Sequence, residues 1–257
     1  MRILLPPSET KRSPTRGAPL DLEGLVLPEL ASARRQAIDS LLTLGDWPLA
    51  AACDALGITT RQAGELERNA SVWTAPASEA HTVYDGVLFD ALDFAGRSPA
   101  LRRRISEAVL VQSALFGLVG LGDRIPAYRC SADSQLPGLG RAATYWQPHL
   151  ANSVPRLLEG HCVIDMRSGA YAGMWQPAPG ASAVVVRVMQ ERGGRRVAAS
   201  HFNKATKGLL VADLCASRAQ LDEPAAVARA LAKRDWEVRL ERRAGQVAVL
   251  EVLMRSS

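Results

Sequence analysis

The residues Arg2-Ile-Leu-Leu5 run into Pro6-Pro7 and then into the polar segment Ser8-Glu-Thr-Lys-Arg12, and this pattern sets the first element of the fold. A short apolar run of this kind is typical of a strand, and prolines end a strand because they cannot donate to a sheet ladder. The polar residues after the prolines predict a loop. We therefore expect an N-terminal strand that is followed at once by Ser8 and Lys11.

Further apolar runs along the chain predict more strands. Residues 108–118 predict one buried strand that breaks at Gly120-Leu-Gly122, and residues 125–129 and 162–166 predict shorter strands. Two pairs of strands on either side of glycine turns predict hairpins, 182–190 with 195–202 and 236–241 with 246–253.

Helices are predicted where apolar residues recur every three to four positions and where proline, glycine or threonine marks the ends. Residues 83–94 fit either a strand or a helix. Because strands and helices are mixed rather than strictly alternating, we expect one α+β (mixed α/β) domain over residues 1–257. The predicted helices are 29–44, 48–56, 60–69, 99–106, 141–158, 204–218 and 224–233.

The composition is that of a globular protein, with 257 residues, 47% hydrophobic and 22% charged residues and a mean hydropathy of −0.02. It excludes disordered, collagen-like and coiled-coil chains. No apolar run approaches the roughly 18 residues that span a bilayer, and the N-terminus does not have the pattern of a signal peptide. We therefore expect a cytoplasmic protein that does not contact a membrane.

The scattered cysteines and histidines do not predict a metal or redox site. Cys53, Cys130, Cys162 and Cys215 form no CxxC pair, and the four histidines form no HxxxH or HxH pattern. We expect four reduced, mostly buried thiols, no metal and no cofactor.

The net positive charge of the chain comes entirely from its second half. Residues 1–128 hold 13 basic and 15 acidic residues, whereas residues 129–257 hold 18 basic and 11 acidic residues. A basic half suggests a phosphate-bearing partner, although the sequence pI of about 9.3 also fits an ordinary enzyme. Only four of the 31 basic residues are lysines. In such a chain a lysine is favoured where a compact or deprotonatable amine is needed.

Two of these lysines lie in the segment His201-Phe-Asn-Lys-Ala-Thr-Lys-Gly208. A strand is predicted to end near Phe202, and Asn203 is a good N-cap for the helix that follows. Lys204 and Lys207 then fall one turn apart on one helix face. Cations at a helix N-terminus oppose the helix dipole unless an anion is held there, which favours a functional role over a solvated pair.

The turn Gly-Leu-Gly occurs twice, at Gly120-Leu-Gly122 and at Gly138-Leu-Gly140. Both resemble the hairpin of a helix-hairpin-helix element, whose backbone N–H groups bind a DNA phosphate without reading sequence. The second copy fits better because Arg141 begins a predicted helix. The residues before it, 129–135, are short and polar, so the alternative is a plain glycine turn.

Polar residues also follow or interrupt the predicted strands, and ligands collect at strand ends in mixed sheets. No nucleophile–base triad, Walker-A loop or dinucleotide loop is present in the sequence. Each residue of this set therefore fits a ligand site or a satisfied structural group. The set consists of Ser8, Ser113, Tyr128, Arg129, Asp165, Arg167, Ser168 and Tyr171.

These motifs together resemble the YaaA family of peroxide-stress-response proteins, from residue 3 to about residue 215. Each motif alone is weak, but their order and combination are specific. The motifs are Leu4-Leu-Pro-Pro-Ser-Glu-Thr-Lys11, Tyr84-Asp-Gly86, Ser113-Ala-Leu-Phe-Gly117, Ile125-Pro-Ala-Tyr-Arg129, Tyr145-Trp146, the Ser168–Tyr171 stretch and Asn203-Lys-Ala-Thr-Lys-Gly208.

The resemblance implies a single domain in which helices wrap a mixed sheet around a positively charged cleft. It also implies sequence-independent binding of double- or single-stranded DNA through a helix-hairpin-helix-like element, and protection from oxidative damage by limiting free iron. No ligand set for iron is apparent in the sequence, so we expect an indirect effect. On this resemblance the residues that line the cleft are Ser113, Gly117, Tyr128, Arg129, Trp146, Ser168, Tyr171, Lys204, Lys207 and Gly208, to which the first loop adds Ser8 and Lys11.

Two functions remain open from the sequence. In the first, the protein binds DNA and performs no chemistry. In the second, the cleft is an active site for a small nucleotide-like or other anionic substrate, with Lys204 as electrophile or base and with Tyr128, Arg129 and Ser168 orienting the substrate. The depth of the lysines distinguishes the two, because phosphate-tracking residues are exposed whereas a catalytic lysine is enclosed.

Overall fold

The computed structural model describes residues 1–192, 195–198 and 203–254. Its main sheet is mixed and has the strand order β11-β12-β9-β8-β1-β3-β4, with β10 paired to β9. The central strands are parallel, and the pairs β3–β4, β9–β10 and β11–β12 are antiparallel. The strands are β1 (Arg2–Leu5), β3 (Val109–Ser113), β4 (Gly117–Gly120), β8 (Val163–Asp165), β9 (Ala183–Arg192), β10 (Arg195–Ala198), β11 (Val238–Glu241) and β12 (Ala248–Leu253).

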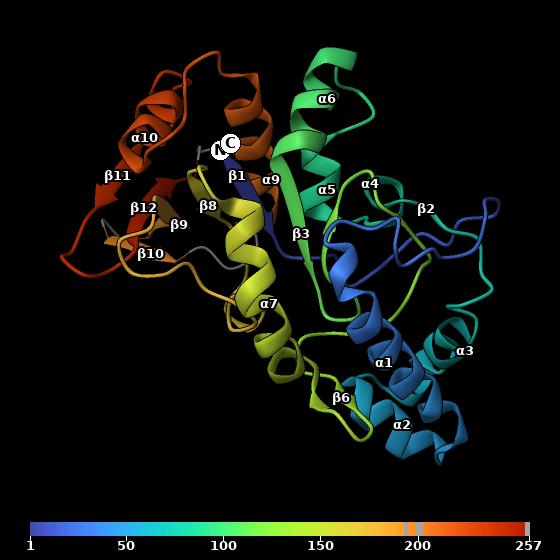
Figure 1. Cartoon of the computed structure of the whole chain (residues 1–257). Coiled ribbons are helices and arrows are strands. Elements are labelled where there is room, and N and C mark those ends of the chain that lie inside the picture. Colours follow the sequence, from blue (N-terminus) through green and yellow to red (C-terminus); the bar gives the residue numbers. More distant parts are fainter. Residues whose placement is uncertain (193–194, 199–202, 255–257) are drawn as a thin grey trace.

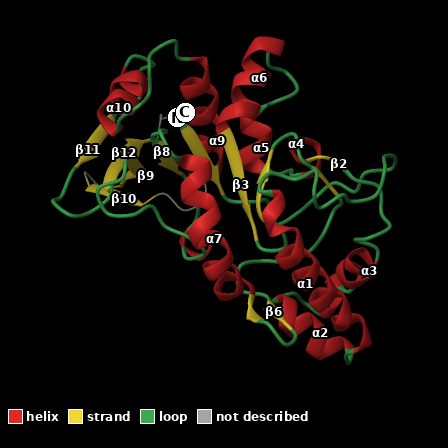
Figure 2. Ribbon diagram, in the orientation of Figure 1, coloured by secondary structure: helices red, strands yellow, loops and turns green. Residues whose placement is uncertain are grey.

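Helices flank this sheet (Figures 1 and 2). They are α1 (Ala31–Leu42), α2 (Leu49–Leu56), α3 (Gly64–Ala70), α4 (Ala80–Val83), α5 (Val87–Leu92), α6 (Pro99–Ala108), α7 (Ala142–Leu158), α8 (Gly169–Ala172), α9 (Asn203–Ala216) and α10 (Pro224–Ala232). Short 3-10 turns precede α1, α2 and α3, at Pro28–Leu30, Thr43–Asp46 and Thr60–Gln62. Helices α1, α2 and α3 gather at the end of the molecule away from α10 and β11 (Figure 1).

One continuous hydrophobic core joins these layers. Ile3, Leu4 and Leu5 of β1 are fully buried at its centre because helices and neighbouring strands cover both faces of that strand. The mixed α/β fold expected from the sequence is confirmed. The four cysteines are also buried and unpaired, as expected. None of the described helices is both long and apolar enough to cross a membrane.

The predicted single strand at residues 108–118 is wrong, because the chain turns back on itself there. Strand β3 ends at Ser113, and Gly117 begins the antiparallel strand β4. Ser113 Oγ accepts hydrogen bonds from the backbone N–H groups of Leu115 and Phe116, and this closes the tight turn. Gly117 has φ +74°, a conformation that glycine adopts without strain.

Neither Gly-Leu-Gly turn lies between two helices. Gly138-Leu-Gly140 lies within a small hairpin of β6 (Gln135–Leu136) and β7 (Gly140–Arg141). Gly120-Leu-Gly122 joins β4 to β5 (Arg124–Ile125), which pairs with β2 (Ser78–Glu79). A strand therefore replaces the first helix that a helix-hairpin-helix element needs at each turn, and neither Gly-Leu-Gly turn is the hairpin of such an element.

The remaining elements agree with the sequence to within a few residues. The strand predicted at 125–129 is reduced to Arg124–Ile125, and the ambiguous segment 83–94 forms helix α5 after the end of α4. Both predicted hairpins are present. The last residues predicted for the first hairpin, 199–202, lie outside the described residues, and His201 with them.

Candidate functional site

The parallel strands β1, β3 and β8 end at one edge of the sheet. Leu4 pairs with Asp165 of β8 on one side, and Leu5 pairs with Val111 of β3 on the other. Since neighbouring parallel strands have their carboxyl ends at the same edge, the segments that follow them meet there. The sheet therefore brings together Ser8–Lys11, Ser113 and Arg167–Ser168, which lie far apart in the sequence.

A chain of three buried hydroxyl groups lies at this edge. Tyr128 Oη is 2.7 Å from Ser113 Oγ and 3.0 Å from Tyr84 Oη. Because Ser113 Oγ already accepts two backbone N–H groups, its own proton is donated to Tyr128. Tyr128 then donates to Tyr84, whose proton is left for a further acceptor. Burial raises the pKa of both phenols, so both stay protonated.

The Lys11 amine lies against these phenol rings. Its Nζ is 4.1 Å from the centroid of the Tyr128 ring and 5.6 Å from that of Tyr84, and it donates to Ser8 O at 2.9 Å. The side chain is only 7% exposed. Burial, and next the positive charge of Arg129, lower the pKa of Lys11 to about 8. A bridge between the backbones of Lys11 and Tyr84 fixes this arrangement.

Arg129 forms an ion pair with Glu9, the acidic residue on the same loop as Lys11. Its Nη2 is 2.7 Å from Glu9 Oε2, and its Nη1 donates to Glu9 O at 3.2 Å. Asn69 holds the Arg129 backbone by accepting from its N–H at 2.7 Å and donating to its C=O at 2.8 Å. Arg129 Nε is buried and has no hydrogen-bond partner within the described part of the chain. Arg129 is thus firmly placed and retains an unused donor.

Tyr171 belongs to the same cluster, whereas Ser168 does not join the hydroxyl chain. Burial raises the pKa of Tyr171, and Cys130, Glu9 and Tyr84 contribute to this shift. Ser168 precedes α8, is exposed and forms no side-chain hydrogen bond to the start of that helix. The two residues predicted from one stretch therefore lie at different depths.

Lys204 and Lys207 do not share one face of α9. Lys204 is exposed, whereas Lys207 is buried with 7% exposure. The boundary between the exposed and the buried side of α9 falls between the two lysines, because Gly208 packs closely against α5. A Cβ at position 208 would lie 2.2 Å from Leu88 O. Burial lowers the pKa of Lys207, and Asp165 opposes this shift. Gly208 therefore supports the site by close packing rather than by contact with a ligand.

Asp165 and Arg167, two of the strand-end residues, form a buried ion pair that the sequence did not predict. Arg167 Nε and Nη2 donate to the two oxygens of Asp165 at 2.9 and 2.7 Å. Arg167 Nη1 donates to Gln112 Oε1 at 2.8 Å, and Gln112 donates to Gly117 O at 2.6 Å. Both Asp165 oxygens accept from Arg167, and the charge of Asp165 raises the pKa of Lys207 although the two residues form no ion pair. In the sequence, the one indication of this pair is that Asp165 and Arg167 lie at the end of a predicted apolar strand.

Gly117 and Trp146 support the site from below and do not line a cleft. Trp146 is fully buried, and its Nε1 donates to Ala114 O at 2.7 Å. A Cβ on Gly117 would lie 2.8 Å from the Trp146 ring. These contacts hold the turn that presents Ser113. Gly117 and Trp146 therefore act on the site through packing.

A small cavity of about 200 Å³ opens beside the first loop. Pro6–Thr10, Asp85–Phe89 and Lys204 line it. Two side chains tie its walls together, since Thr10 Oγ1 donates to Asp85 Oδ1 at 2.7 Å and Asp85 N donates to Ser8 Oγ at 3.2 Å. The exposed amine of Lys204 and the loop that carries Lys11 therefore lie on the same cavity.

The side chains at this edge of the sheet are of the types that bind anions and transfer protons. The cluster offers cationic groups, buried hydroxyl donors and an amine of lowered basicity. Within residues 1–192, 195–198 and 203–254, no group of three or more histidine, cysteine or carboxylate side chains is arranged to hold a metal ion.

Comparisons with known proteins identify relatives over almost the whole chain. The sequence model of one family, described as peroxide stress protein YaaA, matches residues 1–239. A UPF0246 protein of Streptomyces coelicolor is 40% identical over 241 residues, which cover 94% of this chain and 93% of that protein. A UPF0246 protein of Corynebacterium efficiens is 40% identical over 220 residues, which cover 84% and 86% of the two chains. An uncharacterised protein of Campylobacter jejuni is 25% identical over 213 residues, 82% of this chain and 83% of its own.

The family match spans the strands, the loops and the helix α9 that build the candidate site. It agrees with the order of motifs from Leu4–Lys11 to Asn203–Gly208, which suggested the same family from the sequence. The chain belongs to the YaaA family of peroxide stress proteins.

Proposed function

We propose that the protein acts in the peroxide stress response by binding a phosphate-bearing ligand at the carboxyl edge of its sheet. One observation carries this proposal. Lys11 and Lys207 are both buried, yet no described carboxylate lies within 4 Å of either amine. A buried charge without a partner is costly, and a bound anion relieves that cost.

The surrounding groups favour phosphate among anions. Lys207 lies in the first turns of α9, a 14-residue helix whose N-terminal N–H groups attract negative charge. Lys204 adds an exposed amine at the cavity of about 200 Å³. A cavity of this size suits a single phosphorylated sugar or nucleotide fragment rather than a drug-sized ligand. The enclosed lysines support the reading in which the site takes a small anionic group.

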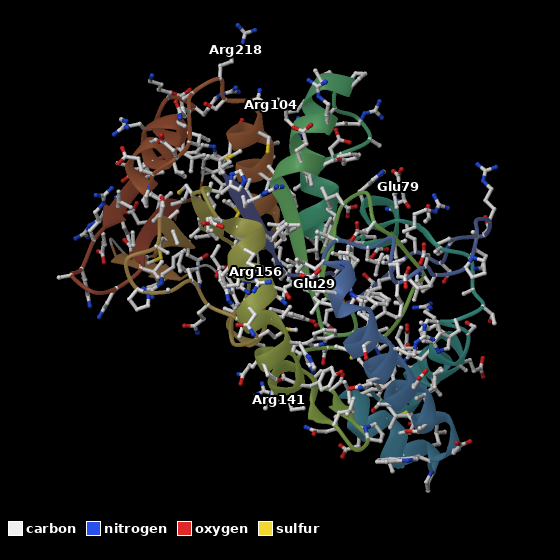
Figure 3. All side chains as sticks on the ribbon, viewed as in Figure 1. Glu29, Glu79, Arg104, Arg141, Arg156 and Arg218 are labelled. Atoms are coloured by element: carbon white, nitrogen blue, oxygen red, sulfur yellow. The ribbon has the colours of Figure 1, made fainter. Side chains whose placement is uncertain are left out.

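DNA binding, which the resemblance implies, is a second candidate function. The exposed arginines of the basic second half favour it. Arg141 before α7, Arg156 within α7 and Arg218 after α9 are exposed, and Figure 3 shows them at widely separated places on the molecule. Exposed arginines spread over the molecule suit contacts with phosphates at several points of a long backbone rather than with one small ligand. DNA and a small phosphorylated ligand would then use different groups of this chain.

The resemblance also implies protection from iron-linked damage and a cytoplasmic location. We keep both as proposals, and we expect the effect on iron to be indirect. In that case loss of the phosphate site, rather than of a metal site, would abolish protection in cells exposed to hydrogen peroxide.

Calorimetric titration with 2-deoxyribose 5-phosphate tests the primary proposal. The variant Lys207→Met removes the buried cation and keeps an unbranched side chain. It should weaken binding by roughly 10- to 100-fold, the value of one charge-assisted hydrogen bond. The matched control is Lys233→Met, an exposed lysine next to α10 that should bind as the wild type does.

Fluorescence anisotropy with a labelled DNA duplex and single strand over a salt series separates the two candidates. If Lys207→Met and wild type bind DNA equally, with affinity that falls steeply with salt, exposed arginines contact the phosphates. If 2-deoxyribose 5-phosphate does not bind the wild-type protein, the primary proposal is wrong.

A further inference from the structure

Lys11 carries the enclosed amine of this site. Among the described residues, the one hydrogen-bond acceptor of this amine is Ser8 O. Its Nζ donates to Ser8 O, a neutral acceptor, while Arg129 binds the nearby Glu9 carboxylate at 2.7 Å. The faces of Tyr84 and Tyr128 cover the amine on another side. No described carboxylate forms an ion pair with Lys11.

These surroundings are those of an activated amine. A lysine becomes a nucleophile at neutral pH when it is desolvated or when another cation lies beside it, and Lys11 has both conditions. Burial and the charge of Arg129 lower the pKa of Lys11 to about 8, so a useful fraction of the amine is neutral near neutral pH. Arginine could not do this, because a guanidinium keeps its proton.

The hydroxyl chain supplies the proton transfer that amine chemistry on a carbonyl requires. Ser113, Tyr128 and Tyr84 form a hydrogen-bonded chain of hydroxyl groups, and with Ser113 as its first donor the Tyr84 hydroxyl at its end would be the group that donates to a ligand. Lys11 lies against both tyrosine rings. An amine and a hydroxyl proton donor are therefore adjacent in a site enclosed from bulk water.

We propose that Lys11 is a nucleophile that captures the aldehyde of a phosphorylated sugar as a Schiff base. This inference rests on the proposed phosphate site and names the chemistry performed there. The amine nitrogen forms a bond to the carbonyl carbon and gives a carbinolamine. The carbon–oxygen bond then breaks, and the oxygen leaves as water with the two hydrogens of the amine. The hydroxyl chain shuttles one of these protons and returns to its starting state.

The phosphate half of the ligand is recognised separately from the aldehyde. Ser8, Glu9 and Thr10 line the cavity that Lys204 closes, and Lys11 follows them on the same loop. A ligand with its phosphate in that cavity would reach the amine past Ser8, a lining residue whose backbone oxygen accepts a hydrogen bond from Lys11 Nζ at 2.9 Å. Two sources share this chemistry: a free sugar phosphate, and an abasic site in DNA, whose ring-opened deoxyribose is an aldehyde between phosphates.

Reductive trapping tests the inference. The full-length protein is incubated with sodium cyanoborohydride and either 2-deoxyribose 5-phosphate or a DNA duplex with one abasic site. Cyanoborohydride reduces the carbon–nitrogen double bond to a stable secondary amine. Intact-mass measurement and peptide mapping then locate the adduct. We expect it on Lys11, at least tenfold more abundant than on the exposed Lys204 or Lys233.

Variants separate a chemical role from a structural one. Lys11→Arg keeps the charge and should lose at least tenfold of the adduct. Tyr128→Phe keeps the ring and removes the middle hydroxyl, and it should slow trapping several-fold. Peptide mapping on the wild type decides the matter even where a variant folds poorly.

Each outcome supports or overturns the proposal. An adduct spread evenly over the lysines, or retained in Lys11→Arg, overturns it. Binding of 2-deoxyribose 5-phosphate without any adduct on Lys11 from either probe also overturns it and leaves the proposed phosphate site standing. An adduct with the free sugar phosphate alone identifies a small-molecule substrate, whereas one with the duplex alone identifies damaged DNA.

Discussion

Replacing Lys11 by methionine gives the sharpest test of how the site is built. The substitution removes a buried amine and keeps an unbranched chain of similar length. Burial lowers the pKa of Lys11 from its ordinary value of 10.5 to about 8, which means that the folded protein disfavours the charged form. The unfolded chain has no such preference, so the charge of Lys11 reduces the free energy of unfolding at neutral pH.

The sign and size of this effect follow from proton linkage. Between pH 8 and pH 10.5 the unfolded chain binds more protons at Lys11 than the folded protein does, so this group makes the protein more stable as the pH rises. With about 1.4 kcal/mol for each unit of pKa, the charge costs about 3 kcal/mol at pH 7 and about 1 kcal/mol at pH 10. The difference in the free energy of unfolding between wild type and Lys11→Met should therefore shift by about 2 kcal/mol over that range, in favour of the wild type.

Urea denaturation of both proteins at pH 7 and pH 10 measures this shift. Other groups titrate in the same range, but they do so in both proteins and cancel in the difference. The lost contacts with Ser8 O and the tyrosine rings offset part of the gain expected for the variant at pH 7. Lys233→Met is the control for removal of an exposed lysine. A wild-type-to-variant difference that is the same at both pH values would refute the argument that Lys11 is desolvated.

Two further predictions concern the groups beneath the site. Gly117→Ala forces a Cβ at φ +74° to within 2.8 Å of the Trp146 ring and should cost about 3 kcal/mol or more, whereas Gly138→Ala, at the same φ with nothing within 4 Å of its Cβ, should cost only about 1–2 kcal/mol. Urea denaturation compares them, and equal losses would show that the Trp146 contact is not the cause. Asp165→Asn leaves Arg167 buried without its carboxylate and should cost about 3–5 kcal/mol, seen by calorimetry as a melting temperature lowered by about 10 °C. An unchanged melting temperature would contradict the importance of this pair.

Most elements of the fold could be predicted from local patterns. The apolar run Arg2–Leu5 before two prolines is strand β1, and the glycine turn near residue 245 closes the hairpin of β11 and β12. These signals are local, because periodicity and turn residues act within a few positions of the chain. The error at residues 108–118 arose because apolar strand residues continue through the turn. Only the hydrogen bonds of Ser113 and the left-handed Gly117 show where the chain reverses.

Arg34 shows what local patterns miss. It lies within a predicted helix, where an arginine is expected to face water. In the structure it is fully buried and donates to five backbone carbonyls, two of them those of Phe116 and Leu118 near the start of β4. Unpaired carbonyls in a segment that crosses the core need such a donor. That need exists only once the segment before α1 is packed against the sheet.

The sequence by itself determined the family, the mixed α/β class and the presence of polar residues after the central strands, since motif order and strand-end residues can be read along the chain. Only the tertiary structure determined how deeply each of these polar residues is buried. It placed Lys207 inside and Lys204 outside although they are three residues apart, because Gly208 fits against α5 and sets which side of α9 is covered. It also pairs Glu9 with Arg129, so that Lys11 has no carboxylate partner among the described residues. Pairing and burial of this kind depend on which distant segments the sheet brings together, and no local pattern records them.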